Sequence, residues 1–291
     1  AKLHFGYTDG ISMTTIRGGP EKYHPDHQQA CEPWLFVLRE EAGNYVVPEP
    51  RELGLNGSFA VFKKVETDVV GFENFLQSNK DKIDPELLAA KMCGRWRNGV
   101  PLALSPDTDS PAGGISPEQM NNFEYVSADG SGDPKGIRCP VGAHIRRVNP
   151  RGQPVAGQGQ PGGSNNSHRI IRRGLPYGPI YDPTKPYDGI ERGILFYFIN
   201  ANIENQYEFV LRRWVNDSEF VGAVRLNPNS KDPLIGTQDP AESVFIIPQA
   251  NGSPPTEIKG LSSFVTTKAA AYVFLPSITA IKFVANLGAS V

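Results

Sequence analysis

The sequence predicts an α+β fold, a ferredoxin-like βαββαβ plan interrupted by long loop insertions. Two observations predict this plan. A strand-like segment and a helix-like segment follow each other early in the chain, and a strand, a helix and a further strand follow one another late. The stretch between them is rich in turn-forming residues, and the whole chain contains 30 glycines and 26 prolines.

The early elements are predicted from hydrophobic periodicity. Residues 58–65 alternate and are rich in aromatic and β-branched residues, which is typical of a strand. Residues 66–79 place Val69, Phe72 and Leu76 on one face at helical spacing. Asp84 then supplies an N-cap before an N1 proline and an acidic first turn, which predicts a second helix to about residue 96.

The late elements follow a loop-rich stretch over residues 99–186. Residues 194–199 predict a buried strand, and residues 271–275, ended by Pro276, predict another. The segment after the first of these strands places apolar side chains on one helical face, and they are Ile203, Tyr207, Val210, Leu211 and Trp214.

Composition excludes several classes of protein. The chain is 39% hydrophobic and 21% charged with a formal net charge of -2, which gives no electrostatic reason to expect a nucleic-acid or membrane partner. No apolar run approaches the roughly 18 residues that span a bilayer. Cys31, Cys93 and Cys139 are far apart and odd in number. This argues against a disulfide framework or a cysteine zinc site, and favours a cytoplasmic over a secreted protein.

Three segments carry candidate chemistry, and each has a simpler interpretation. His144 stands in Gly-Ala-His-Ile-Arg-Arg, which is either a basic solvated loop or an iron ligand beside arginines that compensate the carboxylates of haem. Asp9 lies between Gly6 and Gly10, as in a plain turn or where the backbone passes close to a flat ligand. Arg172 begins an Arg-Arg pair that is surface charge or a carboxylate contact.

In this order, the three segments resemble the dye-decolourising peroxidases. The matching motifs are GxxDG at residues 6–10, GAHIRRxNPR at residues 142–151 and RRGxPYG at residues 172–178. The resemblance covers essentially all 291 residues, and the long loops are similar to those of the larger, elaborated members. It implies a haem-dependent enzyme that uses hydrogen peroxide to oxidise bulky dyes and phenolic compounds.

The resemblance also implies roles for individual residues. His144 would be the ligand of the iron of haem b, while Asp9 and Arg172 would be the catalytic acid and arginine on the opposite face. Gly10, Ile11 and Ser12, which follow Asp9, would lie along the haem.

Further residues would complete the pocket. Ile194 and Phe196 are two apart on one strand, so they share a face and match the apolar distal wall of the family. Arg147 is the candidate for a propionate contact, with Arg146 or Arg151 as alternatives. A ligand histidine normally donates its second nitrogen to a carboxylate, for which Glu204 and Glu257 are the candidates.

Members of the family have two ferredoxin-like halves that form a dimeric α/β barrel, with GxxDG after the first half. Here the motif begins at residue 6. We therefore expect residues 1–57 to be the distal-haem segment and loops. Residues 58–291 would be the C-terminal half with a haem-binding insertion at about 99–186. Either a separate polypeptide or fragment supplies the other half, or the pocket is open on one side. The first alternative is favoured, because a lone half would expose an apolar sheet face.

Other hypotheses remain at this point. The chain could bind haem or handle its iron without being a peroxidase, or the motifs could be turns of a structural protein. A non-haem metal site could use His24 and His27 with Glu21 or Asp26. If the haem is buried, a bulky dye must give its electrons to a surface side chain. Trp214 is the candidate for this role, unless it only completes an apolar helix face.

Overall fold

The computed structural model describes residues 2–19, 30–40, 47–127, 129, 131–155, 165–182, 184, 187–221 and 230–287. The residues of the hypothetical non-haem metal site lie outside this part of the chain. No helix among the described residues is long and apolar enough to cross a bilayer.

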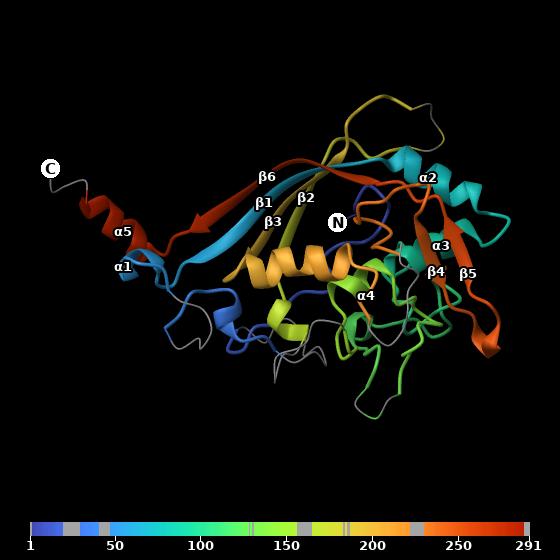
Figure 1. Cartoon of the computed structure of the whole chain (residues 1–291), viewed down its shortest axis with the longest axis horizontal. Helices are drawn as coiled ribbons and strands as arrows, with labels where there is room; N and C mark the ends of the chain where they lie inside the picture. The colour runs from blue at the N-terminus through green and yellow to red at the C-terminus, as the bar shows by residue number, and fades with distance from the viewer. Residues whose placement is uncertain are drawn as a thin grey trace.

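One antiparallel sheet organises the molecule (Figure 1). Its strands lie in the order β2-β3-β1-β6, and they are β1 (Ser58–Thr67), β2 (Ile171–Tyr177), β3 (Gly193–Asn200) and β6 (Val265–Leu275). Helix α2 (Val69–Ser78) follows the first strand, and the π-helical segments η4 (Glu204–Glu208) and η5 (Val210–Val215) follow the third. This is the order of a βαββαβ unit, so the predicted α+β, ferredoxin-like fold is confirmed.

The remaining elements lie in the connections. The short helices are η1 (Pro33–Leu35), α1 (Arg51–Gly54), η2 (Gln119–Asn121), α4 (His144–Val148), η3 (Asn165–His168) and η6 (Ala250–Gly252). Longer helices are α3 (Pro85–Cys93) and α5 (Ile278–Leu287), and β4 (Val244–Ile247) pairs with β5 (Thr256–Lys259) in a separate hairpin.

Local signals fixed several of these boundaries. The predicted N-cap Asp84 accepts a hydrogen bond from the Leu87 amide at 3.0 Å, and α3 begins at Pro85. The strand β2 lies inside the predicted loop-rich stretch over residues 99–186, and the sequence did not predict it. Gly174 and Pro176 interrupt the apolar pattern of β2, and an edge strand tolerates them because it pairs on one side only.

The main core lies between α2, α3 and the β4–β5 hairpin, and it anchors the N-terminal segment. The rings of Phe5 and Phe72 are 4.5 Å apart, and the Tyr7 hydroxyl donates to the Ala89 carbonyl at 2.8 Å. The π-helical segments and the loop that carries α4 lie on one side of the sheet (Figure 1). On the opposite face, Leu175 and Tyr197 are 66% and 45% exposed.

Candidate active site

A cavity of about 1120 Å³ lies between the sheet, α4 and the N-terminal segment. It contains every predicted site residue except Arg147: Asp9, Gly10, Ile11, Ser12, His144, Arg172, Ile194 and Phe196. These residues come from four separate stretches of the chain, which the fold brings to one place. Apart from Arg147, the sequence therefore selected residues that share a single pocket.

His144 is positioned by the contact between α3 and α4. It is the first residue of α4, while α3 ends at Gly94 with a left-handed φ of 97°. A Cβ at Gly94 would lie only 2.5 Å from Cγ1 of Ile145. The absence of a side chain at Gly94 therefore allows the left-handed end of α3 and also allows α4 to pack closely against it. This packing places His144 at the cavity wall.

A buried carboxylate holds the His144 ring. Nδ1 of His144 lies 2.8 Å from Oδ2 of Asp232, which is fully buried. Burial opposes the charged form of Asp232, yet His144 and the amides of Leu234 and Ile235 more than offset it and lower the pKa of this carboxyl. Nδ1 then serves as a donor to the carboxylate, and Nε2 forms no hydrogen bond with the described residues.

The predicted partners of His144 were wrong. Glu204 is exposed at the start of η4, and Glu257 pairs with Lys259 at 3.1 Å on the β5 strand. Asp232 lies 88 residues beyond His144 in Lys231-Asp232-Pro233, which is an ordinary turn sequence. Nothing local distinguishes it, so only the folded chain reveals this pair.

The structure also corrects the role expected of Arg147. Its guanidinium is fully buried and donates to the carbonyls of Gly142, Trp214, Asp217 and Ser230. These bonds tie α4 to the end of η5 and to the segment before Asp232. Arg147 therefore stabilises the loop structure behind His144 and does not face the cavity.

The two alternatives to Arg147 are engaged as well. Arg146 donates to Asp133, Gln153 and the Cys139 carbonyl. Arg151 lines the cavity, but its guanidinium donates to Asn121 and to the Phe123 carbonyl.

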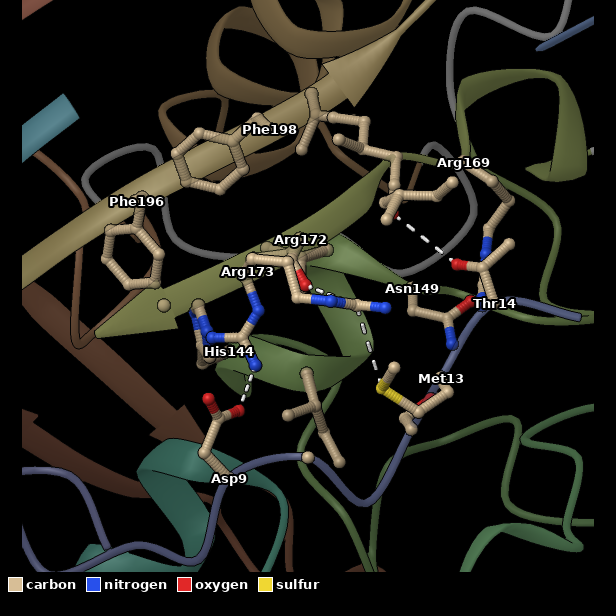
Figure 2. A pocket seen from close by; sticks show the side chains of 18 of the residues that line it. Asp9, Met13, Thr14, His144, Asn149, Arg169, Arg172, Arg173, Phe196 and Phe198 are labelled. Atoms are coloured by element: carbon tan, nitrogen blue, oxygen red, sulfur yellow. Dashed lines mark hydrogen bonds and ion pairs between the residues drawn. The ribbon is translucent and has the colours of Figure 1, made fainter. Parts of the chain in front are cut away.

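Asp9 and Arg172 form an ion pair across the pocket (Figure 2). Asp9 follows the buried Tyr7, and the amide of Thr8 donates to the Arg97 carbonyl at 3.0 Å, so the turn is tied to the core. Arg172 comes from the edge strand β2. The Asp9 and Arg172 side chains retain 17% and 41% of their exposure, so solvent-sized molecules can reach the pair.

Aromatic side chains of β3 form the adjoining wall. Ile194, Phe196 and Phe198 alternate toward the cavity, and the rings of Phe196 and Phe198 are 5.1 Å apart (Figure 2). Gly174 of β2 is paired with Phe196, and a Cβ at Gly174 would lie 2.8 Å from Cε1 of that ring. The ring thus occupies the space that a side chain on β2 would need.

Trp214 is not at the surface. It is 1% exposed and packs edge-on against His168, Phe209 and Phe220. The apolar helix face predicted for this segment is present, and Trp214 completes it. A bulky molecule therefore has no contact with this ring.

Comparisons with known proteins find relatives in sequence and in backbone, although no family model matches the chain. A dye-decolorizing peroxidase of Mycena epipterygia is 31% identical over 311 residues, which cover 97% of this chain and 57% of that protein. A solved dye-decolorizing peroxidase variant in complex with cyanide is 28% identical, with a TM-score of 0.78. The match covers 97% of this chain and 63% of the chain in that structure. Another dye-decolorizing peroxidase structure, in complex with 2,6-dimethoxyphenol, is 29% identical, with a TM-score of 0.76. That match covers 96% of this chain and 62% of the other chain.

The chain thus spans between 57% and 63% of the length of these relatives. The likeness extends over nearly all of its own residues, in sequence and in backbone. By both measures, the chain belongs to the dye-decolorizing peroxidase family.

Proposed function

We propose that the chain binds haem in this cavity and reacts with hydrogen peroxide to oxidise organic reductants, such as phenols and dyes. One observation carries the proposal. A histidine held by a buried carboxylate and an aspartate–arginine ion pair line the same cavity, although they come from distant parts of the chain. The solved relative in complex with 2,6-dimethoxyphenol supports a phenolic reductant.

The cavity fits a large, flat cofactor with carboxylate groups. Its volume of about 1120 Å³ exceeds the roughly 300–1,000 Å³ of ordinary small-molecule sites. Ile194, Phe196 and Leu234 supply apolar walls. His144 would bind the iron of haem b through Nε2, and the bond of Nδ1 to Asp232 would orient the ring and raise its basicity.

The charged pair would act on peroxide. Bound haem would supply the redox chemistry by which hydrogen peroxide yields water and two oxidising equivalents. Asp9 would accept a proton from the peroxide and return it to the departing oxygen. Arg172 would stabilise the negative charge that develops there, from a position fixed before the reaction.

Arg169 replaces Arg147 as the candidate for a propionate contact. It lines the cavity three residues before Arg172, and Figure 2 shows it beside Asn149 and Thr14. Guanidinium groups bind carboxylates with two parallel hydrogen bonds, which makes arginine well suited to this role.

The test combines spectra with turnover. We expect haem titrated into the protein to give a Soret band, and the His144→Ala variant to bind haem much more weakly and to lose turnover with peroxide and 2,6-dimethoxyphenol. Full haem binding with undiminished turnover in the variant would remove His144 from its role. A Soret band without any turnover in the unmodified protein would favour the alternative, a protein that binds haem or handles its iron.

We also propose that a second ferredoxin-like half packs on the sheet face opposite the cavity. The exposed Leu175 and Tyr197 lie on that face, and a sheet normally buries such residues. Co-expression with the N-terminal half of a relative should give a stable complex in size-exclusion chromatography. Failure to associate in repeated pairings would argue against it.

A further inference from the structure

We propose that Lys63 and Thr267 form a binding site for small aromatic carboxylates on the sheet wall of the cavity, with the ring of the ligand against Phe196. The site rests on the proposed peroxidase function and sharpens it, because it identifies a class of reductant that the cavity would prefer, phenols that carry a carboxylate. Its central feature is a lysine that faces the cavity without a neutralising partner among the described residues.

Lys63 lies on the cavity face of β1, beside the apolar wall. It lines the cavity and is paired in the sheet with Phe196 of β3, which lines the cavity as well. Its side chain makes no hydrogen bond or ion pair with any other residue that the structure describes. Burial lowers the pKa of its ammonium group, and no described carboxylate lies close enough to offset this effect. An anion that enters the cavity would stabilise the charged form of Lys63.

The acidic groups of this part of the sheet lie on its opposite face. Lys64, the next residue along β1, lies 3.0 Å from Glu191, and Lys268 of β6 lies 2.8 Å from Glu66. Because successive side chains of a strand alternate between the two faces, Lys64 and Glu66 point away from the cavity. Neither carboxylate is therefore on the face of the sheet that carries Lys63.

The cavity offers an anion little repulsion. Asp9 is the only carboxylate among the described residues that line it, and it forms an ion pair with Arg172. Arg172 is paired with Phe198 of β3, and Lys63 is paired with Phe196 on the other side of that strand. Strand spacing and rise then put the two backbones on the order of 12 Å apart. The lysine side chain and one aromatic ring together can bridge this gap, so a ligand held at Lys63 would extend toward Asp9.

A β-bulge brings a hydroxyl group to the wall near Lys63. The register of β1 and β6 shifts between Lys64 and Val65, so that Thr267, and not Lys268, lies opposite Val65. Both Val65 and Thr267 line the cavity, and bulges commonly redirect side chains next to active sites. The Thr267 hydroxyl makes no hydrogen bond within the described part of the chain. With Lys63 it would offer a carboxylate one charged and one neutral donor.

The surface around Lys63 favours an aromatic carboxylate over an inorganic anion. Phe196 adjoins Lys63 in the sheet, and Val65 is the next residue of β1 on the same face. Aromatic rings pack against each other with a gain beyond that of burial alone. On the other side of Lys63, the edge strand β6 presents the small and exposed side chain of Ala270, which leaves room for a ligand. A flat acid one ring wide therefore has both an apolar contact and a cationic one.

The first test measures binding without turnover. Calorimetric titration of the haem-loaded protein with benzoate should give a defined Kd, whereas benzamide, a neutral molecule of the same shape, should bind much more weakly. Lys63→Met should weaken benzoate binding by about tenfold or more, as expected for the loss of one charged hydrogen bond. Thr267→Val should weaken it by about threefold. Lys64→Met is the matched control on the opposite face and should leave this Kd unchanged.

The second test compares two reductants that differ only by a carboxylate, 4-hydroxy-3,5-dimethoxybenzoate and 2,6-dimethoxyphenol. The ratio of their kcat/KM values, acid to neutral phenol, should fall by about tenfold in Lys63→Met, chiefly through a higher KM for the acid. Lys63→Arg keeps the charge and should retain most of the ratio. Lys64→Met should leave the ratio as it is in the unmodified protein.

The outcomes separate this site from the peroxidase function. If the unmodified protein does not bind benzoate, or if Lys63→Met binds it equally well, the site is refuted, and turnover of 2,6-dimethoxyphenol would still support a peroxidase. If Soret titration shows that Lys63→Met loses haem affinity by the same factor as benzoate affinity, Lys63 contacts a propionate and the carboxylate site is refuted. If benzoate binds through Lys63 but neither phenol is oxidised, the binding site stands, while its role for reductants fails with the peroxidase function.

Discussion

The two sides of the cavity hold their polar groups in different ways. Behind His144, Asp232 and Arg147 are fully buried, and their partners include backbone groups from several segments. Across the cavity, Asp9 and Arg172 meet by side chain alone, from a turn and an edge strand, and both keep some exposure. The first side is suited to hold a ligand bond in a fixed geometry, and the second to exchange protons with a small molecule that enters.

The largest effect should come from the buried side. Replacing Arg147 with Met leaves the carbonyls of Gly142, Trp214, Asp217 and Ser230 without this donor. We expect the free energy of unfolding to fall by about 3–5 kcal/mol, measured by urea denaturation. Arg212→Met is the control, because Arg212 is exposed and should cost less than about 1 kcal/mol. Equal losses in the two variants would contradict a buried structural role.

On the open side, the effect should be on rate and not on stability. Arg172→Leu removes the charge that faces Asp9, and the reaction with hydrogen peroxide should slow by about 10²–10³-fold in stopped-flow absorbance. Arg173→Leu is the matched control on the same strand, since Arg173 donates to the Arg172 carbonyl and should have a much smaller effect. A rate in Arg172→Leu that equals that of the unmodified protein would show that Arg172 is not the catalytic arginine.

A smaller effect should follow when the buried pair is weakened without a change in size. Asp232→Asn keeps an oxygen that can accept from Nδ1 of His144 but removes the charge. Loss of such a carboxylate partner typically costs about 10–100-fold in metal affinity or activity. Haem affinity from Soret titration should therefore fall within this range, whereas Glu204→Gln should leave it unchanged. An unchanged affinity in Asp232→Asn would mean that the pair only packs the loop.

The smallest effect concerns an ion pair outside the cavity. Its contribution to stability can be compared with the effects expected on the two sides of the cavity. The hydrogen bond from Arg192 lowers the pKa of Asp188 to about 2, below the roughly 3.9 of an unfolded chain. The pair therefore stabilises the fold above pH 4, and this contribution is lost as the pH falls toward 2. Asp188→Asn should lower the urea midpoint slightly at pH 7, and the difference should shrink at pH 3. A constant difference would rule out the carboxylate charge as its cause.

The sequence predicted those parts of the fold in which apolar spacing and end signals agree. β1, α2, α3 and β3 each combine a regular pattern with a cap, a proline or a clear boundary. β2 was missed because its arginines, glycine and proline serve the cavity and the sheet edge, so no hydrophobic period remains. α4 is only five residues long and depends on its packing against α3, which no local pattern reveals.

For the site, the sequence motifs predicted which residues line the cavity, but they did not predict the hydrogen-bond partners of those residues. Asp9, His144 and Arg172 all line the cavity, as the family resemblance implied. Asp232 could not be predicted, since its importance depends on a hydrogen bond across 88 residues. Arg147 was misassigned because a basic residue near the candidate ligand His144 is equally suited to bind carboxylates or to cross-link backbone carbonyls. Only burial distinguishes these roles.

Gly174 has a consequence for how the pocket can diverge among related proteins. The Phe196 ring lies where a side chain at position 174 would project. Any larger residue there would push the ring toward the cavity or force the edge strand outward, with Arg172 two residues away. A single position without a side chain thus couples the width of the binding space to the placement of the arginine. A lineage that exchanged this glycine would have to readjust the size of the binding space and the position of the arginine together.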